Sequence, residues 1–244
     1  MASKKKRKVR KAATKVIMVC LIAIFIISGY NVVRILTRYN TDKKAYDGVA
    51  SKAVQDIVGG VVDFDALKAI NPDAIAWLYL EDSRINYPVV KASDNDKYLS
   101  TLFDGSWGWA GTLFTDCATD DPFHQFSTIV YGHHMNDKSM FYSLDYYRDP
   151  EFAKSHPRFE LIMEDGKYHL DVWACVSMAS DSDLYKVNIQ GDARAPYLEM
   201  IKKNAVYMTD VSVGVDDNIV ILSTCAYEYE NARQIVVCKM VPWD

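Results

Sequence analysis

The hydrophobic residues of this chain change their spacing along the sequence, and each spacing predicts a different kind of structure. Residues 16–33 form an uncharged and largely apolar run of eighteen residues. As a helix with about 1.5 Å per residue, this run would be roughly 27 Å long, close to the roughly 30 Å hydrocarbon core of a bilayer. Over residues 40–70 the spacing is helical, and we expect Gly59 and Gly60 to divide this segment into two short helices.

Beyond Pro72 the pattern changes to short runs rich in valine, isoleucine, tyrosine and tryptophan, separated by turn residues. Such runs are typical of strands. We expect eight of them, at residues 75–80, 85–90, 111–116, 128–133, 159–164, 168–177, 218–224 and 234–241. Two helical segments, 140–147 and 195–204, interrupt the strands, and the second lies inside a long connection over residues 178–217. The pattern predicts a mostly β fold with helices, of the α+β class, in which eight strands close into a barrel.

Charge is distributed unevenly along the chain. Residues 1–15 contain eight basic residues and no acidic one, which leaves 20 basic and 32 acidic residues, a net charge of −12, over residues 16–244. Because basic residues stay on the cytoplasmic side of a membrane, we expect a basic cytoplasmic segment at 1–15 and a single-pass transmembrane signal-anchor at 16–33. The remaining residues would then lie outside the cell, as a helical extension over 34–72 and a main domain over 73–244. The acidic main domain argues against nucleic-acid binding.

Two other interpretations of the N-terminus are weaker. A cleaved secretory signal peptide fits the strictly apolar part, residues 16–27, but no clear A-x-A cleavage site follows it. The run KKKRKV is similar to a nuclear import signal, but basic clusters are common and this one directly precedes an apolar span. We therefore expect an uncleaved membrane anchor.

One of the five cysteines stands out by its position. The set contains no C-x-x-C pair, so a zinc ribbon or a dithiol redox motif is not indicated. Cys225 directly follows the apolar run 218–224, NIVILST, and would lie at the rim of a strand. Arg233 opens the next apolar run, so a hairpin would return its guanidinium beside Cys225. A permanently charged donor there suits a reacting carbonyl group.

His133 follows the apolar run STIVYG and is the side-chain type best suited to proton transfer near neutral pH. A neighbouring imidazolium favours the thiolate of a cysteine and can then protonate a leaving amine. A metal site at His133 and His134 is disfavoured, because adjacent strand residues face opposite sides and no third ligand has a recognisable spacing. The order of His133 before Cys225 argues against a papain-like protease, and the caspase signature Q-A-C-x-G is absent.

Together, the segments YGHHMNDKSMF, LSTCAYEYENAR, INYPVV and SDNDKYL closely resemble those of class B sortases, membrane-bound cysteine transpeptidases of Gram-positive bacteria. The resemblance extends from about residue 75 to the C-terminus. It implies a sortase-type barrel with N-terminal helices and a helical insertion before the last two strands. The sequence departs from the family at Ile221, where many members have threonine, and at Cys117, for which we have no functional account.

The resemblance also implies a mechanism. Cys225 would attack the carbonyl of a threonine in the C-terminal sorting signal of a surface protein, His133 would act as acid and base, and Arg233 would stabilise the oxyanion. An amine of the cell wall or of a pilin would resolve the thioacyl-enzyme. Ser223 and Thr224 would line the site, Glu228 is a candidate for peptide binding, and no metal or cofactor is implied. The alternative is a membrane-tethered module that binds sorting peptides without turnover.

Overall fold

The computed structural model describes residues 2–179, 181–225 and 232–243. Its N-terminal part contains α1 (Ala2–Ala53), β1 (Val54–Asp56), β2 (Val61–Val62) and α2 (Phe64–Ile70). The rest comprises β3 (Ala74–Tyr79), β4 (Asn86–Lys91), η1 (Lys97–Leu99), β5 (Leu113–Thr115), β6 (Ser127–Tyr131), η2 (Phe141–Arg148), α3 (Pro150–Ser155), β7 (Arg158–Met163), β8 (Lys167–Ala179), η3 (Asp183–Tyr185), η4 (Gly191–Ala193), α4 (Arg194–Asn204), β9 (Ala205–Met208), β10 (Ile219–Cys225) and β11 (Ala232–Pro242).

The chain divides into two compact units, Met1–Thr41 and Asp42–Asp244. The first unit is helical throughout its described part and contains the apolar span. By length and composition, the helix that includes this span could cross a membrane. The second unit begins within the last turns of α1 and contains all the strands.

Residues 54–62 differ from the helical expectation. They form a small antiparallel hairpin in which β1 pairs with β2. Gly60 adopts a φ of 63°, and its N–H donates to the carbonyl of Ile57 at 3.1 Å, so this glycine closes the turn. The two short helices that we expected are thus the end of the long helix α1 and the separate helix α2. The side chain of Asp63 caps α2 by accepting from the Ala66 N–H at 2.9 Å.

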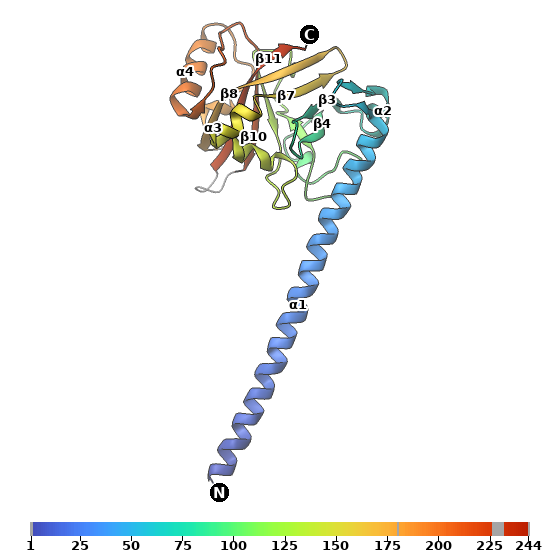
Figure 1. Ribbon diagram of the computed structural model, residues 1–244, viewed down its shortest axis with the longest axis vertical. Coiled ribbons are helices and arrows are strands. Elements are labelled where there is room, and N and C mark those ends of the chain that lie inside the picture. Colours follow the sequence, from blue (N-terminus) through green and yellow to red (C-terminus); the bar gives the residue numbers. More distant parts are fainter. Residues whose placement is uncertain (1, 180, 226–231, 244) are drawn as a thin grey trace. The chain divides into compact units, whose positions relative to one another are not determined.

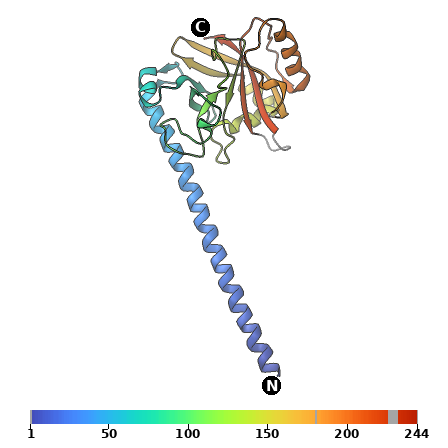
Figure 2. The same cartoon turned by 180° about the vertical axis from the view of Figure 1, so that it is seen from behind.

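Eight strands close into a barrel, which confirms the predicted fold (Figure 1 and Figure 2). Their order is β11-β10-β6-β5-β4-β3-β7-β8, and the antiparallel pairing of β8 with β11 completes the ring. Two pairs in the ring, β6 with β10 and β4 with β5, are parallel. The short strand β9, which the sequence pattern did not predict, pairs with β8 beyond the end of β7.

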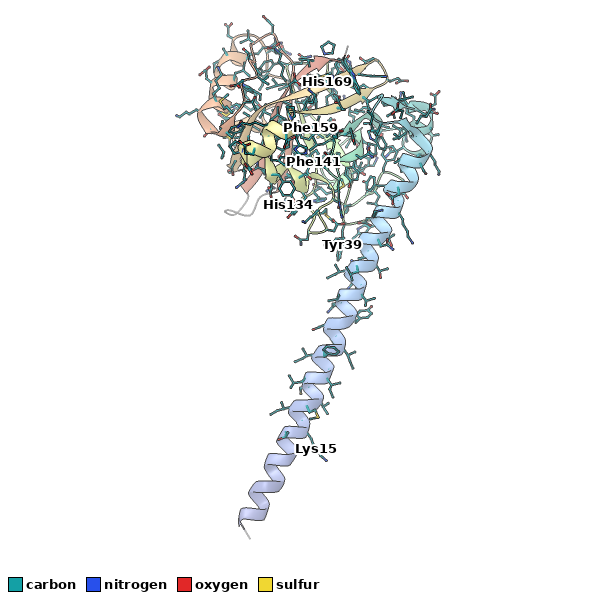
Figure 3. All side chains as sticks on the ribbon, viewed as in Figure 1. Lys15, Tyr39, His134, Phe141, Phe159 and His169 are labelled. Carbon is teal, nitrogen blue, oxygen red and sulfur yellow. The ribbon has the colours of Figure 1, made fainter. Side chains whose placement is uncertain are left out.

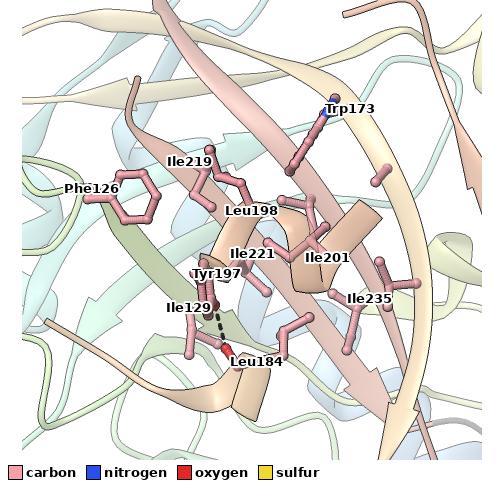
Figure 4. Close-up of a cluster of buried hydrophobic side chains, with 13 residues drawn as sticks. Phe126, Ile129, Trp173, Leu184, Tyr197, Leu198, Ile201, Ile219, Ile221 and Ile235 are labelled. Carbon is pink, nitrogen blue, oxygen red and sulfur yellow. Dashed lines mark hydrogen bonds between the residues drawn. The ribbon is translucent and has the colours of Figure 1, made fainter. Parts of the chain in front are cut away.

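The predicted helical insertions are present, with local differences. The first is a 3-10 helix, η2, and is followed by the unpredicted short helix α3, which Asp149 caps and Pro150 begins. The second contains α4, which packs against β8. Tyr197, Leu198 and Ile201 of α4 form a buried cluster with Ile219 and other barrel residues (Figure 4). This insertion explains the nearly continuous apolar run of β10, because residues at successive positions of that strand are buried on both of its faces.

Candidate active site

The strand register brings Cys225 and His133 to one end of the barrel. In the parallel pair of β6 and β10, Tyr131 lies opposite Ser223. His133 and Cys225 each follow two residues later in their own strand direction, so the backbone carries both residues to the same edge. For Cys225 the structure describes the backbone.

Arg233 returns beside this position as the sequence predicted. In the antiparallel hairpin of β10 and β11, the Cα atoms of Cys225 and Arg233 are direct partners, which corresponds to a separation of about 4.5 to 5.5 Å. On its other side Arg233 pairs with Met178 of β8, so the barrel holds its backbone from both directions. The connection between these strands includes Glu228, which lies outside the described residues.

A cavity of about 310 Å³ opens at this edge. His133, Ser223, Thr224 and Arg233, all named from the sequence, line it. The other lining residues are Asn95, Leu99, Thr112, Phe114, Asp116, Tyr131, Gly132 and Tyr185. The wall therefore combines apolar side chains with a carboxylate and a guanidinium, a combination that is common in ligand-binding cavities.

The backbone around His133 is fixed on both sides. The Gly132 N–H donates to the Ser223 carbonyl at 3.1 Å, and the Phe141 N–H donates to the His133 carbonyl at 2.9 Å. A Cβ on Gly132 would lie 2.6 Å from Cδ2 of Phe141 and would also collide with Leu113. Glycine is therefore required by this close approach, and it lets the chain leave β6 toward His133.

The ring of His133 makes a hydrogen bond to a backbone carbonyl. Its Nε2 lies 2.6 Å from the oxygen of Leu99. Since a carbonyl can only accept, Nε2 carries the proton, and in the neutral ring Nδ1 is the basic nitrogen. The site thus holds one tautomer, with Nδ1 left to exchange a proton.

His134 has different surroundings from His133. Figure 3 labels His134 on the ribbon of the second unit. Its side chain is buried, its Nε2 lies 2.7 Å from a carboxylate oxygen of Asp145, and its ring contacts Tyr142 at a centroid distance of 4.6 Å. It is not among the residues that line the cavity. The two adjacent histidines therefore lie in different environments. The predicted strand to residue 133 ends earlier, because β6 stops at Tyr131 and both histidines follow it.

Sequence reasoning missed the tyrosines and the carboxylate on one wall of the cavity. The hydroxyl of Tyr131 donates to Asp116 at 2.9 Å, and Asn95 donates to the same carboxylate at 3.1 Å. The ring of Tyr131 stacks on that of Tyr185, whose hydroxyl lies 2.7 Å from Oγ of Ser223. Burial, together with the neighbouring Asp116 carboxylate, raises the pKa of Tyr131, so its hydroxyl stays protonated. Tyr131 and Asn95 lie within the segments that resemble sortases, whereas no spacing marks Tyr185.

Two of the other cysteines lie in environments that disfavour a thiolate. Burial raises the pKa of Cys175 and of Cys238. Cys117 is partly exposed, and Cys20 lies in the apolar part of α1. Within the described ranges, no group of three or more histidine, cysteine or acidic side chains could hold a metal ion.

Comparison with known proteins identifies the family. No protein-family model matches the chain. The sortase B of Listeria monocytogenes is 29% identical over 245 residues, which cover 96% of this chain and 99% of the relative. The crystal structure of sortase B from Bacillus anthracis superposes with a TM-score of 0.74 at 32% identity, covering 84% of this chain and 98% of that one. A substrate complex of Staphylococcus aureus sortase B superposes with a TM-score of 0.70 at 28% identity, covering 86% and 97%. The chain therefore belongs to the class B sortases, a family of transpeptidases.

Proposed function

We propose that this sortase cleaves a C-terminal sorting signal with Cys225 as the nucleophile and transfers the acyl group to an amine. The observation that carries the proposal is the register of β6, β10 and β11, which brings the backbones of His133, Cys225 and Arg233 to one edge beside a single cavity. The raised pKa values of Cys175 and Cys238 also favour Cys225 as the reactive thiol.

In the first half of the reaction, the Cys225 thiolate attacks the threonine carbonyl of the sorting signal. The charge that develops on the carbonyl oxygen is stabilised by the Arg233 guanidinium. When the tetrahedral adduct collapses, the peptide bond breaks and the leaving amine takes a proton from His133. The product of this half is a thioester between the peptide and Cys225.

In the second half, an acceptor amine attacks the thioester. Its proton passes to His133, and the carbon–sulfur bond breaks, which frees the Cys225 thiolate. The surface protein leaves joined to the acceptor by the new amide. Because Nε2 of His133 donates to Leu99, Nδ1 is the nitrogen that gives and takes the proton in both halves. The acceptor is an amine of peptidoglycan or of a pilin.

The peptide would lie along the wall formed by Ser223, Thr224 and the apolar side chains of Leu99 and Phe114. Glu228 is a further candidate for contact with the peptide. The structure of a Staphylococcus aureus sortase B has been solved as a complex with its substrate, which supports substrate binding by this chain.

We also propose that residues 16–33 anchor the enzyme in the cell membrane as a single span, with residues 1–15 in the cytoplasm and the catalytic domain, residues 73–244, outside. The apolar helix is long enough for this role, and the positive charge before it fits the orientation.

The test uses a library of quenched fluorescent sorting-signal pentapeptides. Wild-type enzyme should cleave at least one peptide in the presence of an amine, and Cys225→Ala should lose at least about 10³-fold in rate while keeping its melting temperature. Cys117→Ala removes a partly exposed thiol of the second unit and should keep wild-type rates. Normal turnover by Cys225→Ala would reject the mechanism, and peptide binding without cleavage by the wild type would favour a binding module.

A further inference from the structure

Two 3-10 helices determine where the imidazole of His133 lies. The last residue of η1 supplies the Leu99 carbonyl, which accepts from Nε2 at 2.6 Å. The first residue of η2 supplies the Phe141 N–H, which donates to the carbonyl of His133 itself. Any residue that positions both of these helix ends would also set the geometry of the proposed proton transfer.

The backbone of residues 111 and 112 packs against the end of η1, which carries the Leu99 carbonyl. Gly111 has a φ of 56°, and a Cβ there would lie 2.9 Å from the Leu99 oxygen and closer still to that of Tyr98. The Thr112 N–H donates to the Tyr98 carbonyl at 2.9 Å. The backbone of Gly111 therefore packs directly against the carbonyl that orients His133.

The side chain of Tyr46, from the last turns of α1, reaches this point. Its hydroxyl donates to the Gly111 carbonyl and lies 3.2 Å from Oγ1 of Thr112. One turn earlier, Asp42 accepts from the Ala110 N–H at 3.0 Å. Tyr46 is 7% exposed, and burial raises its pKa, which keeps the hydroxyl protonated as a donor.

Tyr46 also contacts Tyr87, which binds the residue before η2. Its ring meets that of Tyr87 edge-to-face at a centroid distance of 5.0 Å. The hydroxyl of Tyr87 accepts from the Met140 N–H at 3.3 Å. Met140 has a φ of 55°, a strained value for such a side chain, so its conformation depends on outside contacts. The next residue is Phe141, the partner of His133.

We propose that Tyr46 is a positioning residue for His133, acting through Gly111 and Leu99 on one side and through Tyr87 and Met140 on the other. The last turns of α1 would then help to select the tautomer of the His133 ring. The kcat measurement rests on the proposed function. The tautomer of the His133 ring does not, because it can be observed without turnover.

Tyr46→Phe tests the proposal, because it removes the hydroxyl and keeps the ring against Tyr87. Tyr147→Phe is the matched control: Tyr147 is also buried, and its hydroxyl donates to a backbone carbonyl, that of His156 at 2.9 Å, away from the cavity. Both variants of the full chain in detergent should lose melting temperature to a similar extent. We expect kcat to fall about tenfold in Tyr46→Phe, with KM within about twofold, and to stay within about twofold of wild type in Tyr147→Phe.

The second readout is nitrogen NMR of the full chain labelled at histidine, at about pH 8.5, where an ordinary imidazole is neutral. The His133 signals, assigned by their loss in His133→Gln, should report the Nε2–H tautomer in wild type and in Tyr147→Phe, and a mixture of tautomers in Tyr46→Phe. A wild-type tautomer in Tyr46→Phe would overturn the proposal, even if kcat fell. If no peptide is cleaved by the wild type, the proposed function fails and the NMR comparison alone decides.

Discussion

Replacement of Gly132 by alanine should lower both the stability and the turnover of the enzyme, because the added methyl group would be overpacked. The new Cβ would lie 2.6 Å from Phe141 Cδ2 and would collide with Leu113, and both of these side chains are fully buried. Relief requires a backbone shift of some tenths of an ångström, because neither neighbour can turn toward solvent. Overpacking of this kind costs about 2 kcal/mol, which urea unfolding at neutral pH would measure. Since His133 is the next residue, kcat should also fall by about tenfold or more.

Gly48→Ala is the control for this substitution. Gly48 lies in α1, and a Cβ there would meet nothing within 4 Å. Alanine is favoured over glycine in a helix by about 1 kcal/mol, so this variant should be as stable as wild type or more so, with unchanged kcat. A Gly132→Ala enzyme with wild-type stability and turnover would refute the argument that close packing beneath His133 sets its position.

Three further predictions follow from the charges and the N-terminal span. Arg233→Ala should lose more activity than Arg233→Lys, because the lysine keeps a positive charge; equal wild-type rates for both in the peptide assay would remove the oxyanion role. The Asp165 carboxylate raises the pKa of His124, so their ion pair should stabilise the fold below about pH 6.5 and lose this effect as pH rises through the raised pKa. His124→Gln should therefore lower the urea midpoint at about pH 5.5 and leave it unchanged at about pH 8.5. The effect should be small because the His124 side chain is 44% exposed. Equal losses of the urea midpoint at both pH values would contradict the predicted pH dependence. Protein extracted from membranes should retain residues 1–33, and a mature N-terminus beyond Ser28 by mass spectrometry would indicate a cleaved signal peptide.

The sequence was sufficient for the barrel because its strands coincide with apolar runs that turn residues separate. It was insufficient where structure depends on partners distant in the chain. The strand β9 forms only because the long strand β8 offers an edge beyond β7. Val54, Ile57 and Val58 have helical spacing, yet β1 pairs with β2 and residues 57–60 form the turn between them, because Gly60 turns the chain back.

Local sequence patterns likewise predict only some of the residues that line the cavity. His133 and Arg233 could be named because each adjoins an apolar strand run with a turn or a hairpin beside it. Tyr185 reaches the cavity from the insertion between β8 and β10, and Asp116 reaches it from the end of β5. Tyr46 lies 65 residues from Gly111 in the sequence. No local pattern predicts these contacts, because they arise only when the barrel closes.

The identity of the acylated residue tests the proposed mechanism most directly. The full-length enzyme would be mixed with an intact sorting-signal peptide that it is known to cleave. The mixture would be quenched in acid, digested and analysed by mass spectrometry. We expect one added acyl group, ending at the threonine of the peptide, on the fragment that contains Cys225, and we expect hydroxylamine to remove this mass. Turnover without such an adduct, or an adduct on Cys117, would contradict it.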